Sequence, residues 1–187
     1  MKRFCVLAAL VAASSLSQTA LAIDPSLESQ VVEWRRHLHQ NPELSNREYE
    51  TSAYVEAHLR SLGLEVQTKV AHTGVVGILR GGQPGPLVAL RADMDALPVA
   101  EQTGLPFASA VTTTYRNQQT GVMHACGHDT HVSILMGVAS TLAAKRNELQ
   151  GDVMFIFQPA EEGAPEGEEG GAELMLKEGL FAERQPD

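Results

Sequence analysis

Apolar residues recur every three or four positions in several stretches, which is the spacing of amphipathic helices. The clearest stretch covers residues 26–40, and Pro42 ends it. Its inward face consists of Leu27, Val31, Trp34 and Leu38. A second helix is predicted over residues 47–62, with an inward face of Tyr49, Ala53, Val55 and Leu59. Further helices are predicted over residues 129–144 and 172–178.

Between these helices lie short segments with the patterns of strands. Residues 64–69 alternate, and residues 74–79 and 151–158 are largely apolar. The continuous run Leu87–Leu90 within 86–91 predicts a strand buried on both faces. Residues 100–120 are polar and without clear period, and we expect them to cross the surface. Alternating helices and strands predict an α/β fold with a largely parallel or mixed sheet flanked by helices.

The first residues have the features of a secretory signal peptide rather than of the fold. Lys2 and Arg3 precede an apolar run from Phe4 to Ala13, and small residues around Ala22 form a cleavage site. A bilayer-spanning helix needs about 20 apolar residues, roughly twice the length of this run. We therefore predict that residues 1–22 are removed after Ala22 and that the protein is periplasmic or secreted.

The charge of the chain narrows its possible partners. Lys and Arg number 14 against 23 Asp and Glu, a formal charge of −9. Nucleic-acid binding needs clustered basic residues rather than an acid excess, so we expect no nucleic-acid partner. We also expect no membrane association after signal cleavage.

The remaining cysteine lies among histidines. Cys5 belongs to the predicted leader, which leaves Cys126 close to His124, His128 and His131. In an extended segment Cys126 and His128 would share a face, and thiolate and imidazole together suit zinc or a similar divalent metal. Gly127 would leave room for the ion. The alternative is packing at a helix start without an ion, and His124 and His131 singly fit packing or support of a ligand better than ligation.

Carboxylates follow two of the predicted strands. Glu161 and Glu162 come directly after residues 151–158, and ligands collect outside the carboxyl ends of strands in open α/β sheets. Adjacent acids in a partly desolvated loop call for a compensating cation. The later acids are predicted to be merely solvated. They are Glu166, Glu168, Glu169 and Glu173.

Asp93 and Asp95 form a third element, at the end of the strand predicted over 86–91. As alternate residues, both could face one site. Two roles remain open for them on the pattern alone. They could bind the ion directly, or they could orient a ligating imidazole by hydrogen bonds.

Taken together, these motifs resemble the M20 metallopeptidase family. The segments that carry the resemblance are 123–131 (MHACGHDTH), 157–163 (FQPAEEG), 34–44 (WRRHLHQNPEL) and Asp93 to Pro98. More narrowly, the chain is similar to the amidohydrolase branch that contains hippurate hydrolases, aminoacylases and auxin-conjugate hydrolases. The resemblance covers essentially everything after the predicted leader.

The resemblance implies a role for each matching residue. Cys126, His128 and Glu162 would bind a divalent metal, zinc or manganese, with one or two ions in the full-length family. Glu161 would be the general base that takes a proton from water and returns it to the departing amine. Asp93 stands where the broader family has histidine, so its role stays open with those of Asp95 and His131. The substrate would be a small N-acyl amino acid, hydrolysed at its amide bond.

The resemblance also implies that residues 23–187 are the N-terminal portion of a longer, zinc-peptidase-like catalytic domain. Family members are about twice as long, with an inserted lid or dimerisation domain and two more histidine ligands, and no histidine follows His131 here. We expect impaired activity, and a homodimer only where that domain is present. One alternative is a non-catalytic periplasmic metal-binding or interaction module. Another is a hydrolase with Cys126 as nucleophile, which leaves the paired glutamates unexplained.

Overall fold

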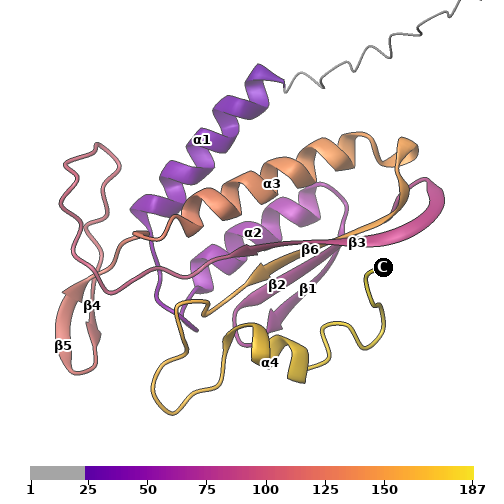
Figure 1. Ribbon diagram of the computed structural model, residues 1–187. Coiled ribbons are helices and arrows are strands. Elements are labelled where there is room, and N and C mark those ends of the chain that lie inside the picture. Colours follow the sequence, from indigo (N-terminus) through magenta and orange to yellow (C-terminus); the bar gives the residue numbers. More distant parts are fainter. Residues whose placement is uncertain (1–23) are drawn as a thin grey trace, which may run out of the picture.

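A four-stranded sheet with helices on both faces organises the molecule (Figure 1). The computed structural model describes residues 24–187, so the predicted signal peptide, residues 1–22, lies outside the described residues. The helices are α1 (Pro25–Gln40), α2 (Tyr49–Ser61), α3 (His128–Ala144), the short 3₁₀ turn η1 (Arg146–Glu148) and α4 (Gly171–Lys177). The strands are β1 (Glu65–Val70), β2 (Gly74–Leu79), β3 (Gln83–Asp93), β4 (Thr112–Tyr115), β5 (Gln118–Gly121) and β6 (Gln150–Gln158).

The main sheet is mixed and has the order β1-β2-β6-β3. β2 is antiparallel to both β1 and β6, whereas β3 and β6 run parallel. The α/β fold with a mixed sheet is therefore confirmed, and the largely parallel alternative does not hold for the described residues. The parallel pair matters most for function, because both of its strands end at the same edge of the sheet.

The two strands of the parallel pair differ in burial. Five consecutive residues of β6, Met154 to Gln158, are buried, as expected for a strand with neighbours on both sides. β3 is the last strand of the sheet in the described part of the chain, and Val88 is 50% exposed. The prediction that Leu87–Leu90 is buried on both faces is therefore wrong, because an edge strand has fewer neighbours to cover it.

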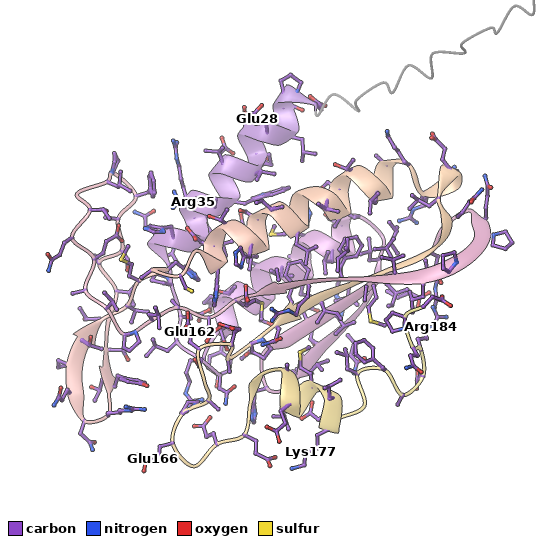
Figure 2. All side chains as sticks on the ribbon, viewed as in Figure 1. Glu28, Arg35, Glu162, Glu166, Lys177 and Arg184 are labelled. Atoms are coloured by element: carbon purple, nitrogen blue, oxygen red, sulfur yellow. The ribbon has the colours of Figure 1, made fainter. Side chains whose placement is uncertain are left out.

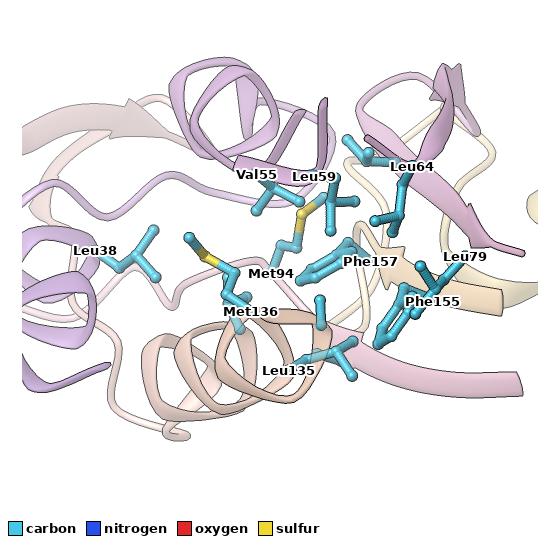
Figure 3. Close-up of a cluster of buried hydrophobic side chains, with 14 residues drawn as sticks. Leu38, Val55, Leu59, Leu64, Leu79, Met94, Leu135, Met136, Phe155 and Phe157 are labelled. Atoms are coloured by element: carbon cyan, nitrogen blue, oxygen red, sulfur yellow. The ribbon is translucent and has the colours of Figure 1, made fainter. Parts of the chain in front are cut away.

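Two apolar clusters cover the two faces of the sheet. On one face Phe155 and Phe157 pack among side chains of α2 and α3, including Leu59 and Met136 (Figure 3). α2 approaches β2 closely, since a Cβ at Gly77 would lie 2.9 Å from a methyl carbon of Leu59. The smaller cluster on the other face lies under α4. It contains Val70, Ala71, Val76, Met154, Ile156, Leu174 and Met175.

Several local predictions need correction. Tyr49 and Ala53 were expected on the inner face of α2, but both are exposed, while Val55 and Leu59 are buried. The helix begins only at Tyr49, so that residue lies at its exposed first turn. The surface excursion predicted for residues 100–120 contains the β4–β5 hairpin, whose paired residues are mostly polar and give no apolar alternation.

Among the described residues, no helix combines the length and apolar character needed to cross a bilayer.

The buried side chains of β6 should contribute strongly to the free energy of unfolding. Phe155 is fully buried, so Phe155→Ala is expected to lower the free energy of unfolding by about 3–5 kcal/mol through lost burial and a residual cavity. Val88→Ala on the exposed edge is the control and should change it by less than about 0.5 kcal/mol. Urea unfolding followed by circular dichroism measures both, and equal effects would contradict this packing.

Candidate metal centre

The ends of β3 and β6 bring two acidic loops together. Asp93 and Gln158 are paired in the parallel ladder, and the N–H of Met94 donates to the carbonyl of Gln158 at 2.9 Å. The chain then turns out of the sheet on both strands, towards Asp95 on one side and Glu161 on the other. The shared strand register is thus what places these carboxylates at one edge.

The start of α3 supplies the thiol and the imidazole. Gly127 is the N-cap of α3 with φ +92, and His128 is the first helical residue. The extended segment expected for Cys126 and His128 is therefore wrong: a left-handed turn separates them. Nothing lies within 4 Å of a Cβ built on Gly127, so glycine is required here by its positive φ rather than by crowding.

Hydrogen bonding fixes the orientation of His128. Its Nδ1 lies 2.7 Å from the backbone carbonyl of Asp95, which can only accept, so Nδ1 carries the proton. Nε2 is then free to act as a ligand atom. It lies 3.6 Å from an oxygen of Glu161 and 3.8 Å from one of Glu162, both longer than hydrogen bonds. A buried imidazole therefore directs its Nε2 towards two carboxylates.

The carboxylate of Asp95 holds the glutamate loop. One oxygen accepts the N–H of Glu161 at 2.9 Å, and the other accepts the N–H of Glu162 at 3.0 Å and the hydroxyl of Ser45 at 2.7 Å. Burial raises the pKa of Asp95, but the hydrogen bonds from His128, Ser45 and these N–H groups outweigh it and hold the pKa below its usual range. Asp95 thus stays ionised and ties both motifs together.

Asp93 is paired with His131 rather than left free. Its Oδ1 accepts from Nδ1 of His131 at 2.5 Å and lies 3.8 Å from Nε2 of His128. Burial raises the pKa of Asp93, while the hydrogen bond from His131 and the charge of His128 bring it below its usual value. Asp93 therefore adds negative charge beside His128.

Within the described residues, two groups of side chains have ligand atoms close enough to share an ion. Cys126, His128 and Glu162 form one, and Asp93, His128 and His131 the other, with the atoms of each group within 4.8 Å of one another. Ligands held at about 2.0–2.3 Å around one tetrahedral ion are separated by distances of this order. The first group, with its sulfur, nitrogen and oxygen donors, matches the three residues predicted as ligands and fits a divalent metal.

The electrostatics of the centre favour a cation. Burial lowers the pKa of His128, yet the hydrogen bond to Asp95 and the charge of Asp93 raise it overall to about 9. The thiol of Cys126 is exposed, and the neighbouring Glu162 raises its pKa. Excess negative charge thus keeps protons on the thiol and the imidazole, and a bound cation would replace those protons.

The remaining predicted residues have distinct surroundings. His124 is 5% exposed, and burial lowers its pKa to about 4, so it is a buried neutral group. Glu168 and Glu169 were expected to be merely solvated, but both form ion pairs. Glu168 pairs with Arg47 and Asn46, and Glu169 pairs with Lys177. These contacts fasten the outer part of the loop in which Glu162 and Glu166 lie (Figure 2).

Two supporting groups were given no role on the sequence alone, although part of one lies in the matched segments. One surrounds Asp129, whose Oδ2 lies 2.8 Å from both Arg35 and His39. The other contains Ser45 and Glu48, which follow the matched segment 34–44. Glu48 is fully buried, and its carboxylate accepts the N–H of Ala160 at 2.9 Å and the hydroxyl of Thr73 at 2.5 Å. In the sequence Glu48 is one of several acids near the start of the helix predicted over 47–62, and nothing singles it out.

Two cavities adjoin the glutamate pair. One of about 690 Å³ is lined by Glu161 and by the cationic side chains of Arg91 and Lys177. The other, of about 800 Å³, is lined by Glu162 and includes Leu97 and Val111. Each glutamate therefore faces a space large enough for part of a small molecule.

Comparison with known proteins identifies the family. The model of Peptidase family M20/M25/M40 matches residues 89–187. The sequence is 48% identical over 156 residues to thermostable carboxypeptidase 2 of Saccharolobus solfataricus, covering 83% of this chain and 37% of that protein. It is 43% identical over 155 residues to N-acyl-L-amino acid amidohydrolase of Geobacillus stearothermophilus, covering 83% and 39%. The chain therefore belongs to peptidase family M20/M25/M40, and the predicted family is confirmed.

A solved structure agrees with this assignment. The YXEP protein of Bacillus subtilis, described as a dinuclear metal binding peptidase from the M20 family, superposes with a TM-score of 0.75 at 41% identity. The match covers 87% of this chain and 42% of that protein. The chain thus spans about two fifths of the length of the relatives that it matches.

The burial of Glu48 predicts a specific pH dependence of stability. Burial raises the pKa of Glu48 to about 7 from 4.5, despite hydrogen bonds from Thr73 and Ala160 that lower it. A raised folded pKa gives stability that is complete below pH 4.5 and is lost as the pH rises through 7. Glu48→Gln should remove this loss, on the order of 3 kcal/mol, because glutamine carries no charge.

Urea unfolding of wild type and Glu48→Gln at pH 5 and pH 8 checks this. Other groups titrate equally in both proteins, so the difference between the two pH dependences isolates Glu48. Identical pH dependence in the two proteins would contradict the prediction.

Proposed function

We propose that this chain carries part of the catalytic centre of a metal-dependent amidohydrolase that cleaves the amide bond of N-acyl amino acids. The observation that carries the proposal is the convergence of Cys126, His128 and Glu162 within 4.8 Å, with Glu161 adjoining. The N-acyl-L-amino acid amidohydrolase among the relatives supports the substrate class.

Three side chains would hold the ion. Cys126 would supply Sγ, His128 its Nε2 and Glu162 one carboxylate oxygen, which is the number of protein ligands that catalytic zinc normally uses. We propose zinc or manganese, and the sulfur donor favours zinc because manganese prefers harder, oxygen ligands. A divalent ion there would act as a Lewis acid towards the amide carbonyl.

Glu161 is placed to move the proton. Its side chain is 40% exposed, and its Oε2 lies beside Nε2 of His128 at 3.6 Å. The backbone N–H of Glu161 is held by Asp95, and the residue lines the adjoining cavity. We assign Glu161 as the general base that accepts a proton from water and delivers it to the nitrogen of the departing amine.

Asp93, Asp95 and His131 would act through the ligands. Asp95 fixes the tautomer of His128 and the backbone of both glutamates, which is the role of groups that support metal ligands. Asp93 and His131, joined by their hydrogen bond, would keep negative charge next to His128. Asp93, His128 and His131 form the other group of possible ligands, but Nε2 of His128 can bind only one ion at a time.

We also propose a cellular location and an oligomeric state for the whole protein. The leader predicted over residues 1–22 supports a periplasmic or secreted location. A homodimer is proposed only for a protein that includes a further domain.

Two neighbouring substitutions separate metal binding from proton transfer. Glu162→Gln should weaken zinc binding by about a hundredfold or more, because loss of a ligand should exceed the 10–100-fold effect of a supporting group. Glu161→Gln should keep metal binding and lower the turnover of an N-acyl amino acid by about 10²–10⁴-fold. Metal content by mass spectrometry and release of free amino acid measure the two effects.

Chelation should abolish the turnover of the wild type, and zinc or manganese should restore it. Bound metal without any hydrolysis would instead support the non-catalytic metal-binding module. Equal loss of metal in both variants would contradict the assignment of metal binding to Glu162 and of proton transfer to Glu161.

A further inference from the structure

The glutamate pair follows a strained residue. Ala160 has φ +50, in the left-handed region that L-amino acids other than glycine, asparagine and aspartate rarely adopt. This conformation turns the chain out of β6 and directs the next residues towards His128. Some other interaction must hold the turn, because Ala160 itself disfavours it.

Three consecutive N–H groups after β6 are accepted by two carboxylates. The N–H of Ala160 donates to Glu48, and those of Glu161 and Glu162 donate to Asp95. Successive N–H groups around a left-handed residue form a concave site for anionic oxygen atoms. Here side chains of the same protein fill that site from two directions.

The side chain of Glu48 serves this arrangement instead of capping its own helix. It is the N-cap of α2, yet its side chain makes no cap hydrogen bond. The N–H groups of Glu50 and Thr51 are instead accepted by Glu43. The carboxylate of Glu48 points to the loop and is held there by the hydroxyl of Thr73, in the turn between β1 and β2.

We propose that Glu48 is a positioning residue for the metal centre, which sets the placement of Glu161 and Glu162 by holding the N–H of Ala160. This inference rests on the proposed function of the glutamate pair. Glu48 lines neither adjoining cavity, and the contact that joins it to the chain of the glutamate pair is its hydrogen bond from the N–H of Ala160.

Cobalt(II) provides a probe that reports ligand geometry. The purified chain is titrated with Co²⁺, and the thiolate-to-cobalt charge-transfer band and the d–d bands are recorded with the dissociation constant. Glu48→Ala should weaken Co²⁺ binding by about 10–100-fold and alter the d–d bands, as loss of a supporting group does. Glu48→Gln can still accept from Ala160 and should stay within about threefold of wild type.

Glu50→Ala is the matched control, since Glu50 is an exposed acid two positions away. It should leave both the affinity and the spectrum unchanged. Wild-type affinity and spectrum in Glu48→Ala would overturn the inference, as would equal losses in Glu48→Ala and Glu50→Ala. Failure of the wild type to bind Co²⁺ would instead overturn the proposed function itself.

A second substitution tests the link through Ala160. Ala160→Gly adopts the positive φ without strain, so in the Glu48→Ala background it should recover part of the lost affinity. No recovery would contradict transmission through this residue.

If Glu48→Ala does not fold, Thr73→Val takes its place. This substitution removes the hydrogen bond from the Thr73 hydroxyl to the Glu48 carboxylate and should give a smaller loss of Co²⁺ affinity. Unchanged Co²⁺ binding in Thr73→Val would then overturn the inference.

Discussion

The geometry of the centre depends on one buried carboxylate. Asp95 accepts the backbone N–H groups of Glu161 and Glu162 through its side chain, and its own carbonyl accepts Nδ1 of His128. One residue at the end of β3 thus positions the loop after β6 and the first residue of α3. The strength of this link comes from hydrogen bonds to an ionised acceptor in a buried setting, where they are stronger than between neutral groups. Without it, the N–H groups of Glu161 and Glu162 would lose their shared acceptor.

Much of the scaffold followed from apolar spacing. The bounds expected for the helix over 26–40 and the strands over 74–79 and 151–158 differ by at most one residue from α1, β2 and β6. β2 and β6 bury continuous apolar runs, which such patterns predict directly, whereas of the inward face expected for α1 only Leu38 is buried. The convergence of Cys126, His128 and Glu162 followed from motif resemblance and from the rule that ligands collect at strand ends.

Other features depend on partners distant in the sequence. The exposure of Val88 reflects the position of β3 at the sheet edge, which no local pattern of residues 86–91 reveals. The β4–β5 hairpin is formed from polar residues that give no alternation. The left-handed conformation of Gly127 replaced an expected extended segment, and Glu48 and Ser45 gained their significance only through contacts with residues 160 and 95.

The fixed orientation of the His128 ring affects how metal binding is coupled to folding. Its ring is held by a hydrogen bond to the backbone carbonyl of Asp95, at the start of a helix that packs on the apolar cluster over the sheet. The centre is thus preorganised, unlike small zinc domains that are unfolded until they bind metal. Protein groups alone orient this imidazole, so a metal ion would not need to order it, and metal binding would exchange protons for a cation at a ring already in place.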